Sequence, residues 1–236
     1  MILNLGGSSL HFETTVVAGT VPVLLLHAAL GAADEMRTLR AQFADRSTIL
    51  VDLPGHGQST HHSDSLTTVD MAGAINSLLD RLSVRQVDVV GYSLGGYVGL
   101  ELGAIAPARV RSVFSHAMKF YWTPEGIEAA VATFGKAKIA ERTIHLTSTL
   151  IRDFLNRRLT VAEIQKAGIP ALITTGELDE FVTAAEVTRL WNEIGTPNVS
   201  FAIFPATGHS LRKLSLDLFE QTVREFWASF DQQDVH

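Results

Sequence analysis

The sequence predicts an α/β fold with a mostly parallel, doubly wound sheet. Six short apolar runs rich in Val, Ile and Leu are the strand candidates, and they are continuous rather than alternating in character. Continuous runs of this kind are typical of strands covered on both faces, as in a parallel sheet. Helical patterns lie between them, which is the βαβ arrangement. The predicted strands are Val21–His27, Thr48–Leu53, Val87–Gly91, Val110–His116, Ala171–Thr175 and Val199–Phe204.

Two short segments before the first of these strands, Ile2–Leu5 and Leu10–Glu13, predict an N-terminal antiparallel hairpin. The helices are indicated by apolar residues at spacings of three and four. They are expected at Ala33–Ala44, Asp70–Leu82, Leu94–Ala106, Ala184–Ile194 and Leu214–Phe230.

The stretch from Lys119 to Lys166 interrupts this alternation, because it contains helical pattern and no strand. Helices are expected at Pro124–Phe134 and at about Lys136–Leu159, the first with Thr123 as its N-cap and proline at its first position. The sequence therefore predicts a core of residues 1–118 and 167–236, with residues 119–166 as a helical insertion over one edge of the sheet.

Composition narrows the classes of function. The net charge is −6 and no Lys/Arg run exceeds two residues, which argues against a nucleic acid or an anionic membrane as partner. The chain has no cysteine, so disulfides, thiolate metal sites and cysteine nucleophiles are excluded. The first residues have no basic region and no long apolar stretch, so no signal peptide is expected. A cytoplasmic protein without metal or cofactor is the prediction.

The segment Val87–Glu101, VDVVGYSLGGYVGLE, places Ser93 between a predicted strand and a predicted helix. Gly91 and Gly95 flank it in the pattern G-x-S-x-G, in which a serine hydroxyl projects from a sharp strand-to-helix turn. The amide of Leu94 begins the helix and is therefore directed to where an oxyanion could form. A chance match in a glycine-containing turn is the other interpretation.

A serine nucleophile needs a base and a group that orients the base. Asp179 follows the strand at Ala171–Thr175, and His209 follows the strand that ends at Phe204. Each alone could be an ordinary loop residue. Together, at the carboxyl ends of strands and in the order Ser, Asp, His, they predict a catalytic triad.

These segments resemble the α/β-hydrolase fold superfamily over nearly the whole chain, in particular a serine-nucleophile, small-lid, esterase-like member. The resemblance rests on GYSLGG together with VDLPGHGQS (Val51–Ser59), LLLHAALGAADEM (Leu24–Met36), GELDEFV (Gly176–Val182) and GHS (Gly208–Ser210). It implies that Ser93 is the nucleophile, His209 the base and Asp179 the orienting acid. It also implies an oxyanion hole made by the backbone N–H groups of Ala29 and Leu94.

One position departs from that family pattern. Ala28 stands where the family usually has glycine, and alanine follows the same path only if its φ is negative. The neighbouring His27 and the loop residue His56 are interpreted as structural.

The substrate-binding residues predicted are Phe120, Tyr121, Trp122 and His116, at the entry to the helical insertion, which resembles the lid of the family. Serine rather than aspartate at the turn favours hydrolysis of an ester or related acyl bond of a small, largely apolar substrate, through an acyl-enzyme. Two alternatives stay open: a C–C bond hydrolase or a lyase/synthase acting on a small metabolite, and a non-catalytic ligand receptor or scaffold.

Overall fold

The computed structural model describes residues 1–6 and 8–231 of the chain. Its centre is a nine-stranded sheet in the order β1-β2-β4-β3-β6-β7-β8-β9, with the short β5 paired to β2. The strands are β1 (Ile2–Asn4), β2 (Ser8–Thr15), β3 (Val23–Leu26), β4 (Thr48–Val51), β5 (Thr60–His61), β6 (Val87–Tyr92), β7 (Val110–His116), β8 (Ala171–Gly176) and β9 (Val199–Phe204).

The sheet is parallel from β4 to β9 and antiparallel at its N-terminal edge. The pairs β3–β4, β3–β6, β6–β7, β7–β8 and β8–β9 are parallel. The predicted N-terminal hairpin is the antiparallel pair β1–β2, and β2 also pairs antiparallel with β4. A doubly wound α/β sheet is thereby confirmed, and the six predicted strands all form with ends shifted by at most two residues.

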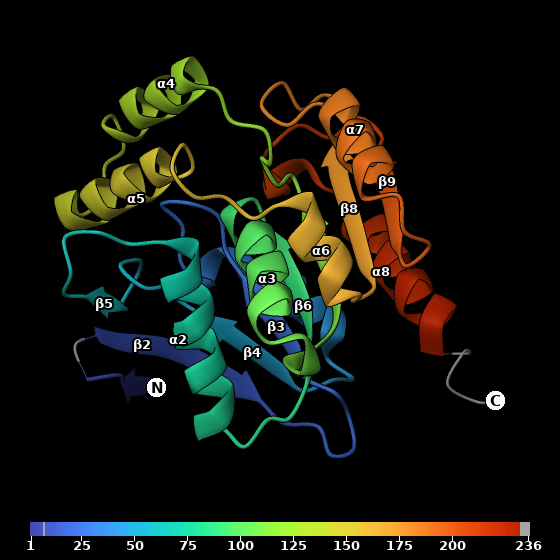
Figure 1. Cartoon of the computed structure of the whole chain (residues 1–236). Helices are drawn as coiled ribbons and strands as arrows, with labels where there is room; N and C mark the ends of the chain where they lie inside the picture. Colours follow the sequence, from blue (N-terminus) through green and yellow to red (C-terminus); the bar gives the residue numbers. More distant parts are fainter. Residues whose placement is uncertain (7, 232–236) are drawn as a thin grey trace.

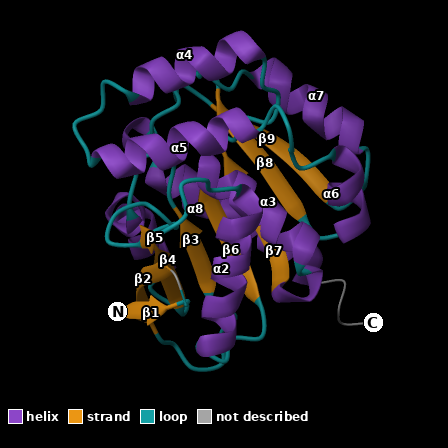
Figure 2. Ribbon diagram, turned by 60° about the vertical axis from the view of Figure 1, so that its left-hand side comes forward, coloured by secondary structure: helices purple, strands orange, loops and turns teal. Residues whose placement is uncertain are grey.

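Helices cover both faces of the sheet (Figures 1 and 2). One face carries α2 (Thr68–Arg81), α3 (Leu94–Ile105), α6 (Val161–Ala167) and α7 (Ala184–Ile194). The other carries α8 (Leu216–Asp231) and the segment of α1 (Arg37–Arg40) with its flanking 3₁₀ turns, at Ala33–Met36 and Ala41–Phe43. Two further 3₁₀ turns are at Pro107–Arg109 and Leu211–Lys213.

Alternate residues of one strand reach the two cores. Leu24 and Leu26 of β3 pack on the side of α2 and α3, whereas Val23 and Leu25 pack on the side of α8, and all four are fully buried. This explains the continuous apolar runs of the sequence, because every position of a central strand faces a covered surface.

The helix predicted at Ala33–Ala44 is wrong as a single helix. The segment is a 3₁₀ turn, a single α-helical turn and a second 3₁₀ turn in succession. Its apolar side chains Met36, Leu39 and Phe43 are buried as the spacing predicts. The pattern identified the buried side and not the type of helix.

The helix predicted at Lys136–Leu159 is shorter, since α5 spans only Glu141–Asp153. The next helix, α6, is separate and begins at Val161. Thr160 and Glu163 form a capping box, in which the Thr160 hydroxyl accepts from the Glu163 N–H at 3.2 Å. Between the helices, the Leu159 N–H donates to the Tyr97 hydroxyl at 2.6 Å and Arg157 binds Glu101. These contacts hold the connecting chain against α3.

The helices α4 (Pro124–Phe134) and α5 lie together beyond the carboxyl ends of the strands, as Figure 1 shows. α6 lies beside α3 and α7 on the face of the sheet instead. The assignment of residues 119–166 to a separate lid stays a prediction, and the structure describes α4 and α5 as its overhanging part.

Candidate active site

Ser93 occupies the turn between β6 and α3, as the spacing predicts. Its backbone has φ 50° and ψ −113°, a conformation that L-residues rarely adopt. The Ser93 N–H donates to the carbonyl of His116 on β7 at 2.7 Å, which helps to hold the turn against the sheet. Strain of this kind persists where the surrounding structure imposes it. At a strand-to-helix turn, it makes the serine hydroxyl project above the sheet.

The glycines around Ser93 let the helix approach the strands closely. A Cβ at Gly91 would lie 2.5 Å from the carbonyl carbon of Gly95. A Cβ at Gly95 would lie 2.5 Å from the carbonyl carbon of Leu26 and 2.8 Å from the carbonyl oxygen of His27. All three separations are shorter than real Cβ contacts, so only glycine fits between α3 and the ends of β3 and β6.

Asp179 and His209 meet at the ends of β8 and β9. The Asp179 Oδ1 accepts the N–H groups of Phe181 at 2.9 Å and Val182 at 2.8 Å, and its Oδ2 lies 2.8 Å from His209 Nδ1. Because a carboxylate only accepts, Nδ1 of His209 carries a proton in this pair and Nε2 offers a lone pair.

The Asp179 carboxyl group is fully buried, whereas the His209 side chain is one-third exposed. Burial by itself raises the pKa of Asp179, but the hydrogen bonds from His209, Val182 and Phe181 outweigh it and hold that pKa below its ordinary value. Asp179 is therefore an anion that orients a solvent-accessible imidazole.

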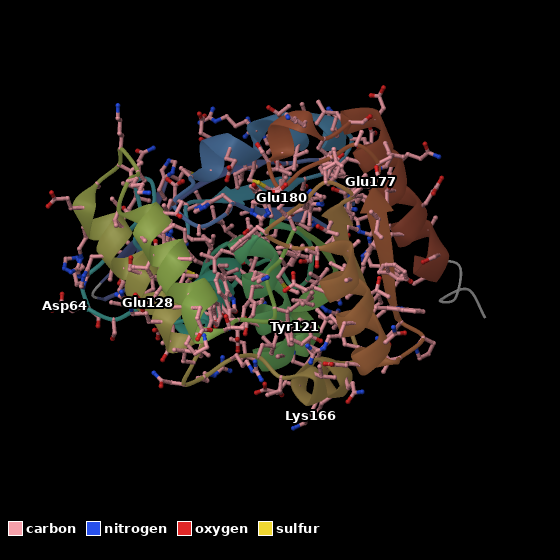
Figure 3. All side chains as sticks on the ribbon, turned by 90° about the horizontal axis from the view of Figure 1, so that it is seen from above. Asp64, Tyr121, Glu128, Lys166, Glu177 and Glu180 are labelled. Atoms are coloured by element: carbon pink, nitrogen blue, oxygen red, sulfur yellow. The ribbon has the colours of Figure 1, made fainter. Side chains whose placement is uncertain are left out.

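A cavity of about 790 Å³ lies beneath α4 and α5, and both Ser93 and His209 line it. Ala29 and Leu94, the predicted oxyanion donors, line it as well. The Leu94 N–H belongs to the first turn of α3, where the helix supplies no acceptor. Figure 3 shows the molecule from the top of Figure 1, the side on which α4 lies. It labels Tyr121 and Glu180, which also line the cavity.

Most of the lining is apolar, and its largest contribution comes from the segment between β7 and β8. Trp122 stacks on Phe154 at a ring distance of 5.8 Å and meets Phe181 edge-on at 5.7 Å. Phe181 in turn contacts the His209 ring edge-on at 5.2 Å. A continuous aromatic wall therefore runs from α5 to the histidine. Further apolar members of the lining include Tyr97, Ala129, Ala130, Phe134 and Ile151.

Two of the predicted binding residues, Tyr121 and Trp122, line the cavity, and the other two do not. Phe120 is buried and packs against Tyr97 at 6.2 Å. His116 is buried behind the cavity, where its Nδ1 lies 3.0 Å from the Thr174 hydroxyl. The pKa of His116 is lowered to about 4, by burial first and then by His209. His116 is the last residue of β7 and Phe120 follows that strand, and both side chains are buried in the core.

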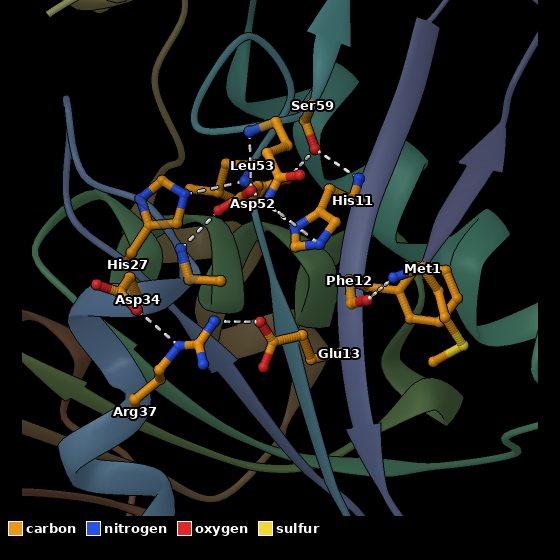
Figure 4. Close-up of polar contacts among 12 residues, drawn as sticks. Met1, His11, Phe12, Glu13, His27, Asp34, Arg37, Asp52, Leu53 and Ser59 are labelled. Carbon is orange, nitrogen blue, oxygen red and sulfur yellow. Dashed lines mark hydrogen bonds and ion pairs between the residues drawn. The ribbon is translucent and has the colours of Figure 1, made fainter.

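His27 is a structural residue. Its Nε2 accepts the Leu53 N–H at 2.9 Å (Figure 4). Its Nδ1 donates to the Ala28 carbonyl at 2.7 Å. Burial and the neighbouring His56 lower its pKa to about 3, so it is neutral. His56 likewise bonds within its surroundings, with Nδ1 3.0 Å from the Pro54 carbonyl.

The VDLPGHGQS loop is organised by Asp52, which the sequence did not single out. Its carboxylate accepts the N–H groups of Ala33 at 2.6 Å and Gln58 at 2.9 Å, and it lies 2.9 Å from His11 Nδ1 (Figure 4). Gly57 folds over this carboxylate with φ 53°, and a Cβ there would overlap it. The loop therefore ties the chain after β4 to Ala33, at the start of the 3₁₀ turn that follows the predicted oxyanion loop.

Tyr92 was also missed, although it stands in the quoted motif. Its hydroxyl donates to the backbone carbonyl of His209 at 3.0 Å, and the two rings lie 5.7 Å apart. The residue before Ser93 thus contacts His209, the predicted base. No pattern within G-x-S-x-G distinguishes such a tyrosine from a core residue.

Among residues 1–6 and 8–231, no group of three or more His, Cys, Asp or Glu side chains could hold a metal ion. In the same part of the chain, no helix has the length and hydrophobicity needed to cross a membrane.

Comparison with known proteins agrees with this architecture. A family model described as alpha/beta hydrolase fold matches residues 21–136. Among curated proteins, the dihydrolipoyllysine-residue acetyltransferase component of the acetoin cleaving system of Cupriavidus necator is 38% identical over 96 residues, which are 40% of this chain and 26% of that protein. The chain therefore matches about a quarter of that relative's length.

Solved structures match over almost the whole chain. A hydrolase from Pseudomonas aeruginosa PA01 superposes with a TM-score of 0.84 at 18% identity, covering 96% of this chain and 97% of that one. A thermophilic esterase from Thermogutta terrifontis superposes with a TM-score of 0.79 at 20% identity, covering 94% of each chain. At these identities the superpositions establish a common fold.

Proposed function

The chain belongs to the α/β-hydrolase superfamily, and we propose that it is a serine hydrolase that cleaves an ester or related acyl bond of a small, largely apolar substrate through an acyl-enzyme. One observation carries the proposal. His209, joined to Asp179 at 2.8 Å, and the strained Ser93 line the same cavity.

In the proposed first step, His209 Nε2 removes the proton of the Ser93 hydroxyl as its oxygen attacks the substrate carbonyl. Asp179 stabilises the imidazolium that forms, because its carboxylate faces the Nδ1–H at 2.8 Å. The two amides that hold the other carboxylate oxygen keep Asp179 in the geometry that this step requires.

The carbonyl oxygen gains negative charge as the tetrahedral intermediate forms. The N–H groups of Leu94 and Ala29 are the proposed donors to it, and both residues line the cavity beside Ser93. A backbone donor at a helix N-terminus needs little reorganisation during the reaction, which is why such donors are effective.

The leaving group departs with the proton that His209 holds, and the acyl group stays on Ser93. Water then enters, His209 takes one of its protons, and the resulting hydroxide equivalent attacks the acyl-enzyme. The second tetrahedral intermediate collapses to the free acid, and His209 returns the proton to Ser93.

The lining favours a modest apolar group. Besides Phe134, α4 contributes Gly126 and the small side chains of Ala129, Ala130 and Thr133 to the lining, which leave room for a modest acyl chain. Charged residues line the cavity on the α7 side, where Lys119 pairs with Glu186 at 2.5 Å. An apolar acyl chain beneath α4 with a more polar portion toward α7 fits this arrangement.

Turnover of p-nitrophenyl esters of increasing acyl chain length tests the proposal. We expect hydrolysis of short to medium chains by the wild type and none above background by Ser93→Ala, whose side chain fits the same turn. Ester hydrolysis that survives in Ser93→Ala would refute the acyl-enzyme. A wild type inert to every ester would favour the C–C cleavage or elimination chemistry of the alternatives.

A further inference from the structure

Glu35 places a carboxylate on the wall of the catalytic cavity, in the 3₁₀ turn that follows the oxyanion loop. Its Oε2 accepts the N–H of Ala28 at 3.1 Å. A negative charge here is unexpected, because the proposed reaction develops a second negative charge beside the neighbouring Ala29. Its presence therefore calls for a structural reason.

The oxyanion loop folds around this carboxylate. A Cβ at Gly31 would lie 2.5 Å from Glu35 Oε2, so glycine is needed for the oxygen to reach the inside of the loop. The Gly31 N–H closes a tight turn by donating to the Ala28 carbonyl at 3.1 Å, and Leu30 takes φ 62° within it. Glu35 thus lies inside the turn that carries the predicted donor.

Both peptide groups that flank Ala28 are held. Glu35 accepts the N–H on one side, and the carbonyl on the other side accepts from His27 Nδ1 at 2.7 Å and from Gly31. That carbonyl shares a planar trans peptide with the Ala29 N–H, so the two point in opposite directions. Fixing the Ala28 carbonyl toward His27 therefore fixes the direction of the Ala29 N–H.

The loop also explains how alanine replaces the glycine usual at residue 28. Ala28 is absent from the positive-φ residues of the described chain, whereas Leu30 is among them. The left-handed conformation thus falls two residues later, and the Ala28 side chain meets no backbone strain. A loop built in this way depends on an acceptor for the Ala28 N–H, and Glu35 supplies it.

We infer that Glu35 is a positioning residue of the oxyanion hole, which acts through the length of its side chain by holding the Ala28 amide so that the Ala29 N–H is aimed at the reacting carbonyl. The inference rests on the proposed serine-hydrolase function. It assigns to Glu35 neither proton transfer nor contact with substrate.

Three substitutions of Glu35 distinguish the effect of its side-chain length from the effect of its charge. Glu35→Gln keeps the length and an acceptor oxygen but loses the charge, Glu35→Asp keeps the charge but is one methylene too short, and Glu35→Ala lacks both. We expect Glu35→Gln to stay within about threefold of wild-type kcat, and the other two to lose about 10- to 100-fold with KM little changed, since a whole lost oxyanion donor costs about 10²–10³-fold. Affinity for an alkyl boronic acid, which mimics the tetrahedral intermediate, should fall in parallel.

Gly31→Ala is an independent variant from the other side of the contact. Its Cβ would displace the carboxylate while Glu35 stays in the sequence, and we expect the same loss of kcat. Thermal unfolding of each variant shows whether the fold is kept.

A readout that needs no substrate distinguishes failure of this inference from failure of the proposed function. Hydrogen exchange of the Ala28 amide should be slow in the wild type and Glu35→Gln, and at least about tenfold faster in Glu35→Asp and Glu35→Ala, because the acceptor is out of reach. Uniform exchange across the four proteins would overturn the inference even if ester turnover is found. Full activity in Glu35→Asp with loss in Glu35→Gln would overturn it too, and would assign a charge role to Glu35.

Discussion

Replacing Asp179 by asparagine removes the negative charge beside His209 while the acid turn can keep its backbone contacts. The amide oxygen of asparagine can still accept the N–H groups of Phe181 and Val182, which Oδ1 accepts at 2.9 and 2.8 Å. The amide nitrogen then faces His209 Nδ1, where Oδ2 lies at 2.8 Å, and it can only donate.

The size of the effect follows from this reversal. His209 must turn its lone pair to Nδ1 and its proton to Nε2, so the atom that faces Ser93 is no longer a base. In a serine triad this exchange of tautomer costs about 10⁴ in kcat, or roughly 5 kcal/mol of transition-state stabilisation. We expect a loss of that order in Asp179→Asn, measured with a p-nitrophenyl ester at neutral pH.

The melting temperature of Asp179→Asn is the control, and it should stay within a few degrees of wild type because the turn contacts remain. A variant that keeps more than about a tenth of wild-type kcat while remaining folded would refute the assignment of Asp179 as the acid that orients His209.

Substitutions at Gly95, Arg157 and His116 test contacts elsewhere in the fold through their effect on stability. Gly95→Ala would press a Cβ onto the carbonyl of Leu26, and we expect about 1–3 kcal/mol of destabilisation in urea unfolding. Arg157→Met leaves the fully buried Glu101 without the guanidinium that it accepts from at 2.7 and 2.8 Å, at a cost of about 3–5 kcal/mol that Glu101→Leu in the same chain should largely restore. His116 is neutral when folded, with its pKa lowered from 6.5 to about 4 by burial and by His209, so the unfolded chain binds more protons between these values. The stability that its neutral form supplies is complete above pH 6.5 and lost as pH falls toward 4, by about 3 kcal/mol in total. His116→Gln should make the fall in unfolding free energy between pH 7 and about pH 4.5 correspondingly smaller, and an unchanged fall would contradict the assignment.

The sequence predicted those features in which local chemistry and periodicity agree. The strand, the serine turn and the following helix are local, because glycine at two positions and a continuous apolar run leave few alternatives for Val87–Glu101. Asp179 and His209 were predicted from their place after strands, since a parallel sheet brings those ends to one edge. The structure brings these two side chains together at 2.8 Å.

Features that depend on contacts between distant segments were not predicted. In the sequence, Glu35 has the position of a surface residue in a helical pattern. Only the folded loop places its carboxylate beside Ala28. Tyr92 and His209 are 117 residues apart, so their hydrogen bond has no local signature. After α5 ends at Asp153, Arg157 is bound by Glu101 of α3, a contact that the periodicity of α5 does not record.

The most direct test of the account is covalent labelling of the nucleophile. A fluorophosphonate reacts with a serine that a neighbouring imidazole activates, whatever the natural substrate. The wild-type protein should gain the mass of one phosphonyl group, located on the peptide that carries Ser93, and Ser93→Ala should gain none. Labelling that persists in Ser93→Ala, or a folded wild type that is not labelled, would contradict Ser93 as an activated nucleophile.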